Sequence, residues 1–192
     1  MSLLEAQSDR LLAAIRLLLT EKGITTADEI ADTVERTNQA SPERGARMVA
    51  RAWLDPEFRA LMLTDGTRAA EAMGVAMRGM PPLGVLENTA DTHNLVVCTL
   101  CSCYPRAVLG YPPFWFKSAA YRARAIRDPA GVLAEWGTVL PQNMRIRVVD
   151  STADYRWMVL PQRPAGTEGW DETRLAGLVR EGDMIGVTVP SV

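Results

Sequence analysis

The spacing of apolar residues changes near position 80 of this 192-residue chain. Before that point leucine, isoleucine, alanine and methionine recur every three or four residues, which is the period of an amphipathic helix. After it, apolar residues gather in short β-branched runs separated by proline and glycine, as in strands. The sequence therefore predicts an α+β fold, with a helical N-terminal arm over residues 1–78 and an α+β domain over residues 79–192.

The arm carries the signals of four helices. Residues 2–22 form an amphipathic stretch that stops at Gly23. Three more helix starts are marked by capping pairs: Thr26 with Glu29, Ser41 with Pro42, and Asp55 with Pro56. The apolar stripe of such an arm packs either on its own domain or on another polypeptide, and the sequence leaves both alternatives open.

The second part of the chain alternates predicted strands with predicted helices. The strands are expected at residues 85–86, 95–97, 146–149, 157–160 and 185–189. Helices are expected over residues 114–127, 129–136 and 171–181.

Charge and hydropathy exclude several classes of partner. A formal net charge of −2 gives no reason to expect binding to nucleic acid or to an anionic membrane. No apolar run approaches the roughly 18 residues that span a bilayer, and the first residues lack the pattern of a signal peptide. We therefore expect a cytoplasmic protein, in which cysteines serve metal or redox chemistry rather than disulfides.

All three cysteines of the chain, Cys98, Cys101 and Cys103, lie within six positions. A zinc site would need a fourth ligand, and the sole histidine, His93, is the one candidate. A lone histidine near a strand is more often a hydrogen-bonded structural residue. A thioredoxin-like C-x-x-C would leave Cys103 without a role, and its βαβ context is missing. Three buried, inert cysteines remain an alternative.

Chelate geometry offers a reading that uses all three sulfurs. The Cys103 sulfur and its own amide nitrogen can close a five-membered ring on a metal, and the amide nitrogens of Ser102 and Cys103 close another. The Cys101 sulfur closes a six-membered ring with the Ser102 nitrogen. Two sulfurs and two deprotonated amides thus form a square plane, Cys98 supplies an axial sulfur, and one octahedral position stays open.

This donor set selects the metal and the chemistry. Displacing amide protons beside soft thiolates points to low-spin Co(III) or Fe(III), and away from zinc, magnesium and calcium. An electrophilic metal with an open position polarises a bound nitrogen or oxygen, or lowers the pKa of bound water. The pattern favours hydration or hydrolysis.

The stretch "VCTLCSC" resembles the metal-binding claw of the nitrile hydratase alpha subunit, a family that includes the related gamma subunit of thiocyanate hydrolase. The resemblance continues through "LGYPPFWFKSAAYRARAIRDPAGVLAEWG", "IRVVDSTADYRWMVLPQRPAGTEGW" and "MIGV", and covers roughly residues 83–190. We call residues 98–103 the claw. Thr99 resembles the cobalt class, since iron enzymes usually carry serine there. The resemblance implies a layered α/β/β/α domain.

The resemblance also implies roles for individual residues. Cys98 is the axial thiolate, Cys101 is oxidised to sulfinate and Cys103 to sulfenate, and Ser102 and Cys103 give amide nitrogens. A nitrile is attacked near the metal by activated water or by the sulfenate oxygen of Cys103, and the product is an amide.

The resemblance further implies a hetero-oligomer. The arginines that hold the oxidised sulfurs come from a β-type partner subunit, so this chain alone is expected to be inactive, and metal-free or unoxidised. Asp150 and Arg156 lie where family members reach towards that partner, although a surface turn and an exposed strand residue would look the same.

Departures from the family pattern concern the substrate. "YPRA" replaces the usual "YPWP" after the claw, which places Arg106 and Ala107 at the pocket. The position of a glutamine that is common in the family falls near residues 78–79, where this chain has no glutamine. In addition, "WFK" replaces "WYK". Losing a tryptophan opens volume, and arginine favours a polar or anionic ligand. We expect a polar or bulky nitrile, such as the nucleoside toyocamycin.

Three alternatives accompany this expectation. The chain could be the gamma subunit of thiocyanate hydrolase, which handles an anion. It could instead be a metal-carrying or redox-sensing protein whose claw never turns over. Arg106 could also be a salt-bridge residue between subunits rather than a substrate ligand.

Overall fold

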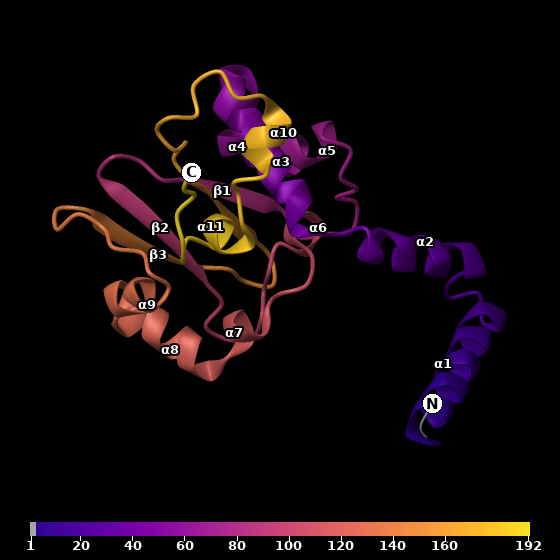
Figure 1. Cartoon of the computed structure of the whole chain (residues 1–192). Helices are drawn as coiled ribbons and strands as arrows, with labels where there is room; N and C mark the ends of the chain where they lie inside the picture. Colours follow the sequence, from indigo (N-terminus) through magenta and orange to yellow (C-terminus); the bar gives the residue numbers. More distant parts are fainter. Residues whose placement is uncertain (1–2) are drawn as a thin grey trace. The chain divides into compact units, whose positions relative to one another are not determined.

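The computed structural model describes residues 3–192, which divide into two compact units between Gln39 and Ala40. The first unit holds α1 (Leu3–Glu21) and α2 (Ala27–Asn38) (Figure 1). The chain leaves α1 through Gly23, which has a φ of 63°. The predicted capping box of α2 is confirmed, because Thr26 Oγ1 accepts from the Glu29 amide at 3.1 Å and Glu29 Oε2 accepts from the Thr26 amide at 2.8 Å.

Three helices begin the second unit: α3 (Pro42–Leu54), α4 (Pro56–Thr64) and α5 (Gly66–Ala72). The starts of α3 and α4 are where the sequence placed them, and Asp55 Oδ1 accepts from the amides of Glu57 and Phe58. The side chains of Met48 and Met62 are fully buried in the core that these helices share with the strands. This boundary differs from the one between residues 78 and 79 that the spacing of apolar residues predicted. The difference arises because α3, α4 and α5 bury apolar side chains in the same core as the strands.

Within residues 3–192, four strands form two parallel pairs. β1 (Leu83–Glu87) pairs with β4 (Arg156–Leu160), and β2 (Thr92–Val97) pairs with β3 (Arg145–Asp150). Four of the five predicted strands are therefore confirmed. Parallel pairing brings the carboxyl ends of β2 and β3 together, with Val97 opposite Asp150.

Short helices follow β2 and β4 along the chain. They are α6 (Arg106–Leu109), α7 (Phe114–Lys117), α8 (Ala119–Arg127), α9 (Pro129–Glu135), α10 (Glu172–Ala176) and α11 (Glu181–Ile185). The helix predicted over 114–127 is interrupted at Ser118, whose hydroxyl accepts from the Tyr121 amide and starts α8. The helix predicted over 171–181 is shorter, because it ends at Ala176.

The strand predicted over residues 185–189 is wrong. Ile185 is the last residue of α11, and Gly186 follows in a left-handed conformation with a φ of 88°. A Cβ atom on Gly186 would lie 1.9 Å from the Asn94 carbonyl oxygen. The end of α11 approaches β2 closely and buries the apolar residues there. This burial produces an apolar run in the sequence that resembles a strand.

The second unit is layered. Helices α8 and α9 pack on β2 and β3, these strands contact the β1–β4 pair, and α4 and α5 pack on β1 (Figure 1). The predicted α+β fold and its α/β/β/α layering are confirmed. None of the helices within residues 3–192 is long and apolar enough to cross a lipid bilayer.

Candidate metal centre

The claw begins where β2 ends. Residues 95–97 are buried, and Cys98 continues into the core with 1% of its surface exposed. The parallel neighbour β3 ends beside it at Asp150, so this carboxylate lies next to the first turn of the claw. Asp150 Oδ1 accepts from the Thr99 amide at 3.0 Å, and Asp150 Oδ2 accepts from the Thr99 hydroxyl at 2.5 Å. Asp150, expected near a partner, thus binds the claw within this chain.

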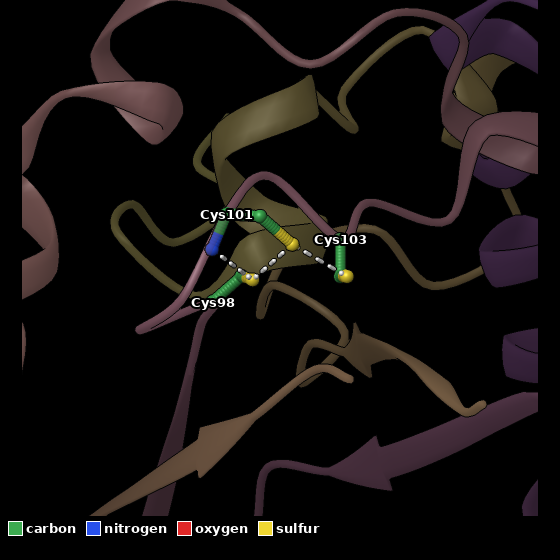
Figure 2. Close-up of side chains that lie close together, drawn as sticks. All are labelled: Cys98, Cys101 and Cys103. Carbon is green, nitrogen blue, oxygen red and sulfur yellow. Dashed lines mark hydrogen bonds between the residues drawn. The ribbon is translucent and has the colours of Figure 1, made fainter. Parts of the chain in front are cut away.

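The three sulfurs converge (Figure 2). The Sγ atoms of Cys98 and Cys101 lie 3.5 Å apart, and those of Cys101 and Cys103 lie 3.0 Å apart. The Cys101 amide donates to the Cys98 sulfur at 3.3 Å. All three sulfurs fall within 4.8 Å of one another, which is the spacing of ligands around one ion.

The thiols differ in their ease of deprotonation. Hydrogen bonds from Cys103 and then from Cys98 lower the pKa of the exposed Cys101 thiol. Burial, followed by its contacts with Cys101 and Cys98, raises the pKa of Cys103 to about 12, while the charge of Arg156 acts in the opposite direction. Binding of a metal here would release this proton, because the thiolate is the form of cysteine that binds metals.

A cavity of about 390 Å³ opens over residues 101–103. Met77, Met80 and Leu83 form its apolar wall, and Arg156 reaches it from the first residue of β4. Among the described residues, the buried Nη1 atom of Arg156 has no hydrogen-bond partner. A buried donor of this kind is matched by an anionic oxygen, so the site fits a claw with oxidised sulfurs.

Arg106 and Ala107 also line this cavity. Arg106 is exposed, and its guanidinium carbon lies 5.3 Å from the centre of the Tyr111 ring. The side chain therefore occupies the rim of the cavity in a cation–π contact.

His93 is separate from this cluster. Its Nε2 atom donates to the Gly186 carbonyl at 2.7 Å, and its Nδ1 atom accepts from the Asn88 amide group at 3.2 Å. Burial lowers the pKa of His93, which keeps the ring neutral. Both ring nitrogens are engaged, so His93 is the structural histidine that the sequence favoured over a zinc ligand.

Sequence reasoning missed two features of the site. Met77 and Met80 line the cavity from the loop before β1, where the pattern signalled only an absent glutamine. The Tyr104 hydroxyl donates to Glu181 Oε1 at 2.6 Å, across 77 positions of sequence. The place of Tyr104 beside the claw was visible, but no sequence signal pairs it with Glu181.

Comparisons with known proteins agree with the fold and the cysteine cluster. Residues 6–188 match the family "Nitrile hydratase, alpha chain". The low-molecular weight cobalt-containing nitrile hydratase subunit alpha of Rhodococcus rhodochrous is 52% identical over 93% of this chain and 86% of its own length. The gamma subunit of thiocyanate hydrolase from Thiobacillus thioparus is 43% identical over 92% of this chain and 77% of its own length.

Solved structures agree as well. A recombinant thiocyanate hydrolase with partially modified cobalt centres superposes with a TM-score of 0.86 and 41% identity, and covers 100% of this chain and 91% of the matched one. The chain belongs to the nitrile hydratase alpha chain family. It is therefore a subunit of an enzyme of the nitrile hydratase class, with a cysteine cluster able to hold a metal.

Proposed function

We propose that this chain is the metal-bearing subunit of a cobalt nitrile hydratase. The observation that carries the proposal is the convergence of three sulfurs within 4.8 Å beneath a cavity. The Sγ atoms of Cys98, Cys101 and Cys103, with the amide nitrogens of Ser102 and Cys103, would hold the ion. The chemistry that cobalt supplies when bound is Lewis-acid activation of a nitrile or of water.

The residues around the ion have separate tasks. In this proposal Cys101 would carry a sulfinate and Cys103 a sulfenate, and the nitrile carbon would be attacked by activated water or by the oxygen on Cys103. Arg156, whose buried Nη1 atom has no hydrogen-bond partner among the described residues, would add a donor to oxygen on an oxidised sulfur beside the arginines of the partner subunit. Met77 and Leu83 keep water from the apolar wall of the cavity.

Cobalt rather than iron is favoured by Thr99 and by the relatives. The R. rhodochrous relative is named as cobalt-containing, and it is 52% identical to this chain. Thr99 itself is not a ligand in this proposal, and its hydrogen bonds to Asp150 fix the backbone next to Cys98. Metal analysis of the assembled protein, produced with cobalt and with iron offered separately, tests this assignment.

We further propose that activity needs one or more β-type partner subunits. An exposed apolar side chain of the claw supports this, since Leu100 is 88% exposed. The first unit exposes a further apolar set on α1, which comprises Leu11, Leu12, Ile15, Leu17 and Leu18. The chain alone should be inactive, and metal-free or unoxidised. Full cobalt occupancy with both sulfurs oxidised in the isolated chain would contradict this.

The substrate proposed is a polar or bulky nitrile, such as toyocamycin. Arg106 at the cavity rim supplies donors for a polar group, and Ala107 leaves room beside it. A thiocyanate hydrolase remains the second candidate, because such a structure matches 100% of this chain. Assays of the cobalt-loaded complex on toyocamycin, small aliphatic nitriles and thiocyanate decide between them. Faster release of carbonyl sulfide from thiocyanate would reverse the ranking.

A cytoplasmic protein that stores or senses metal is the non-enzymatic alternative. Cys103→Ser in the intact complex tests it, because the change removes a ligand and the sulfenate oxygen together. We expect nitrile turnover to fall by at least about a hundredfold, which is the usual cost of losing one group that stabilises a transition state. Unchanged turnover at full cobalt content would remove Cys103 from the chemistry.

A further inference from the structure

The two ends of the claw are held by different parts of the domain. Cys98 continues directly from β2, and Thr99 binds Asp150. Beyond Cys103 the next side chain is Tyr104, which is 2% exposed and packs edge-on against Phe116 with ring centres 5.0 Å apart. Its hydroxyl donates to Glu181 Oε1 at 2.6 Å. One peptide unit joins Tyr104 to Cys103, so fixing Tyr104 restricts where the Cys103 sulfur can lie.

Glu181 is a firm anchor because α11 is held in the core. Met184 and Ile185 of this helix are fully buried. The buried Asp183 carboxylate accepts from the Arg180 amide at 2.8 Å and from the Thr188 hydroxyl, which fixes the first turn of the helix. Glu181 therefore presents its carboxylate to Tyr104 from a rigid support.

His93 ties the other end of α11 back to β2. Its Nε2 atom donates to the carbonyl of Gly186, the residue that ends α11. Only glycine allows this approach, since a Cβ there would overlap the Asn94 carbonyl and the φ of 88° suits no other residue well. The backbone contact and the histidine bond together set α11 against the strand from which the claw emerges (Figure 1).

We propose that His93, Gly186, Glu181 and Tyr104 form a brace that positions Cys103 relative to Cys98. The strand β2 fixes the position of Cys98 directly. Through α11 it also fixes the position of Tyr104, and therefore that of Cys103. Glu181 and Tyr104 are then positioning residues, remote from substrate. The inference rests on the proposed function only in taking Cys103 as a metal ligand.

Thiol labelling of the metal-free, full-length chain tests the brace. The rates at which iodoacetamide modifies Cys98 and Cys103, both buried, are read separately by fragmentation mass spectrometry. Tyr104→Phe keeps the ring and deletes the donor, and Glu181→Leu deletes the acceptor. Each should raise the Cys103 to Cys98 rate ratio about tenfold, as for loss of a hydrogen bond to a charged group.

Matched variants separate positioning from general stability. Glu181→Gln keeps an acceptor and should leave the ratio near that of the unchanged chain, and the double variant Tyr104→Phe with Glu181→Leu should exceed neither single variant. Tyr121→Phe is the control, because this buried tyrosine donates to the Val96 carbonyl at 2.7 Å, outside the brace. An unchanged ratio in Tyr104→Phe, or an equal rise in Tyr121→Phe, would overturn the proposal. If Tyr104→Phe unfolds the chain, the comparison of Glu181→Gln with Glu181→Leu decides.

A second measurement uses the cobalt-loaded complex. Tyr104→Phe should shift the sulfur-to-cobalt charge-transfer absorption and lower kcat with little change in KM, whereas Tyr121→Phe should leave the spectrum unaltered. An unshifted spectrum in Tyr104→Phe counts against the brace. If the unchanged complex hydrates no nitrile, the proposed function fails, while the labelling result on the metal-free chain still stands.

Discussion

The sequence predicted that His93 is a structural residue, but it did not predict which elements His93 joins. The sequence favoured a structural His93 over a zinc ligand, and both ring nitrogens are engaged in hydrogen bonds. Its partner Gly186 was placed in a strand, because apolar burial alone does not distinguish a strand from a helix end. The function of the residue, joining β2 to α11, depends on a contact across 93 positions that local patterns do not encode.

The same residue predicts how stability depends on pH. Burial depresses the pKa of folded His93 below its ordinary value of 6.5, so below that pH the unfolded chain binds a proton that the folded chain does not. The stabilisation is complete above pH 6.5 and is lost as the pH falls towards the folded pKa, by up to about 1.4 kcal/mol per pH unit. His93→Gln, which retains a donor for Gly186, should flatten this slope in urea unfolding at several pH values. Equal slopes in the two proteins would refute the assignment.

Elements, more than individual residues, bring the metal centre together. The clustering of the three cysteines was predictable, because Cys98, Cys101 and Cys103 lie within six positions of sequence. Asp150 was named from sequence, but its bond to Thr99 follows from the parallel pairing of β2 with β3, which no strand pattern specifies. The cavity wall of Met77 and Met80 was not predictable, because a loop placed it there.

The paired strand ends predict the effect of removing the carboxylate. Asp150→Ala leaves the Thr99 amide and hydroxyl without their acceptor, and should lower the free energy of unfolding by about 1–3 kcal/mol. Cobalt content of the complex should fall with it. Thr99→Ser keeps the hydroxyl and is the matched control, expected to retain both values. Measurement is by thermal unfolding and by metal analysis, and undiminished stability in Asp150→Ala would contradict the role given to this bond.

At the scale of the whole molecule, the two compact units differ in how they use apolar surface. The unit from Ala40 onward buries its own core, whereas the unit up to Gln39 leaves leucines of α1 exposed. The helices α1 to α4 were predictable from apolar periodicity and capping residues. The boundary between the two units was not predictable from sequence. A helix that packs on strands and a helix that does not pack on them have the same apolar periodicity.

Deletion of residues 1–39 should therefore separate folding from assembly. The remaining chain should keep its unfolding midpoint to within a few degrees, since its buried residues contact one another. Association with the β-type partner should weaken, measured by gel filtration of the co-expressed proteins. A shortened chain that fails to fold would show that the first unit contributes to the core of the second.

The two elements that support the claw, β3 and α11, follow it in the sequence, which matters during synthesis on the ribosome. Translation produces the three thiols first, while β3 and α11 lie between about 40 and 90 residues later in the sequence. A nascent chain thus exposes the reactive sulfurs before either support exists. We expect cobalt insertion to follow completion of the chain, so that a fragment ending before Arg145 should retain cobalt poorly in pull-down and metal assays.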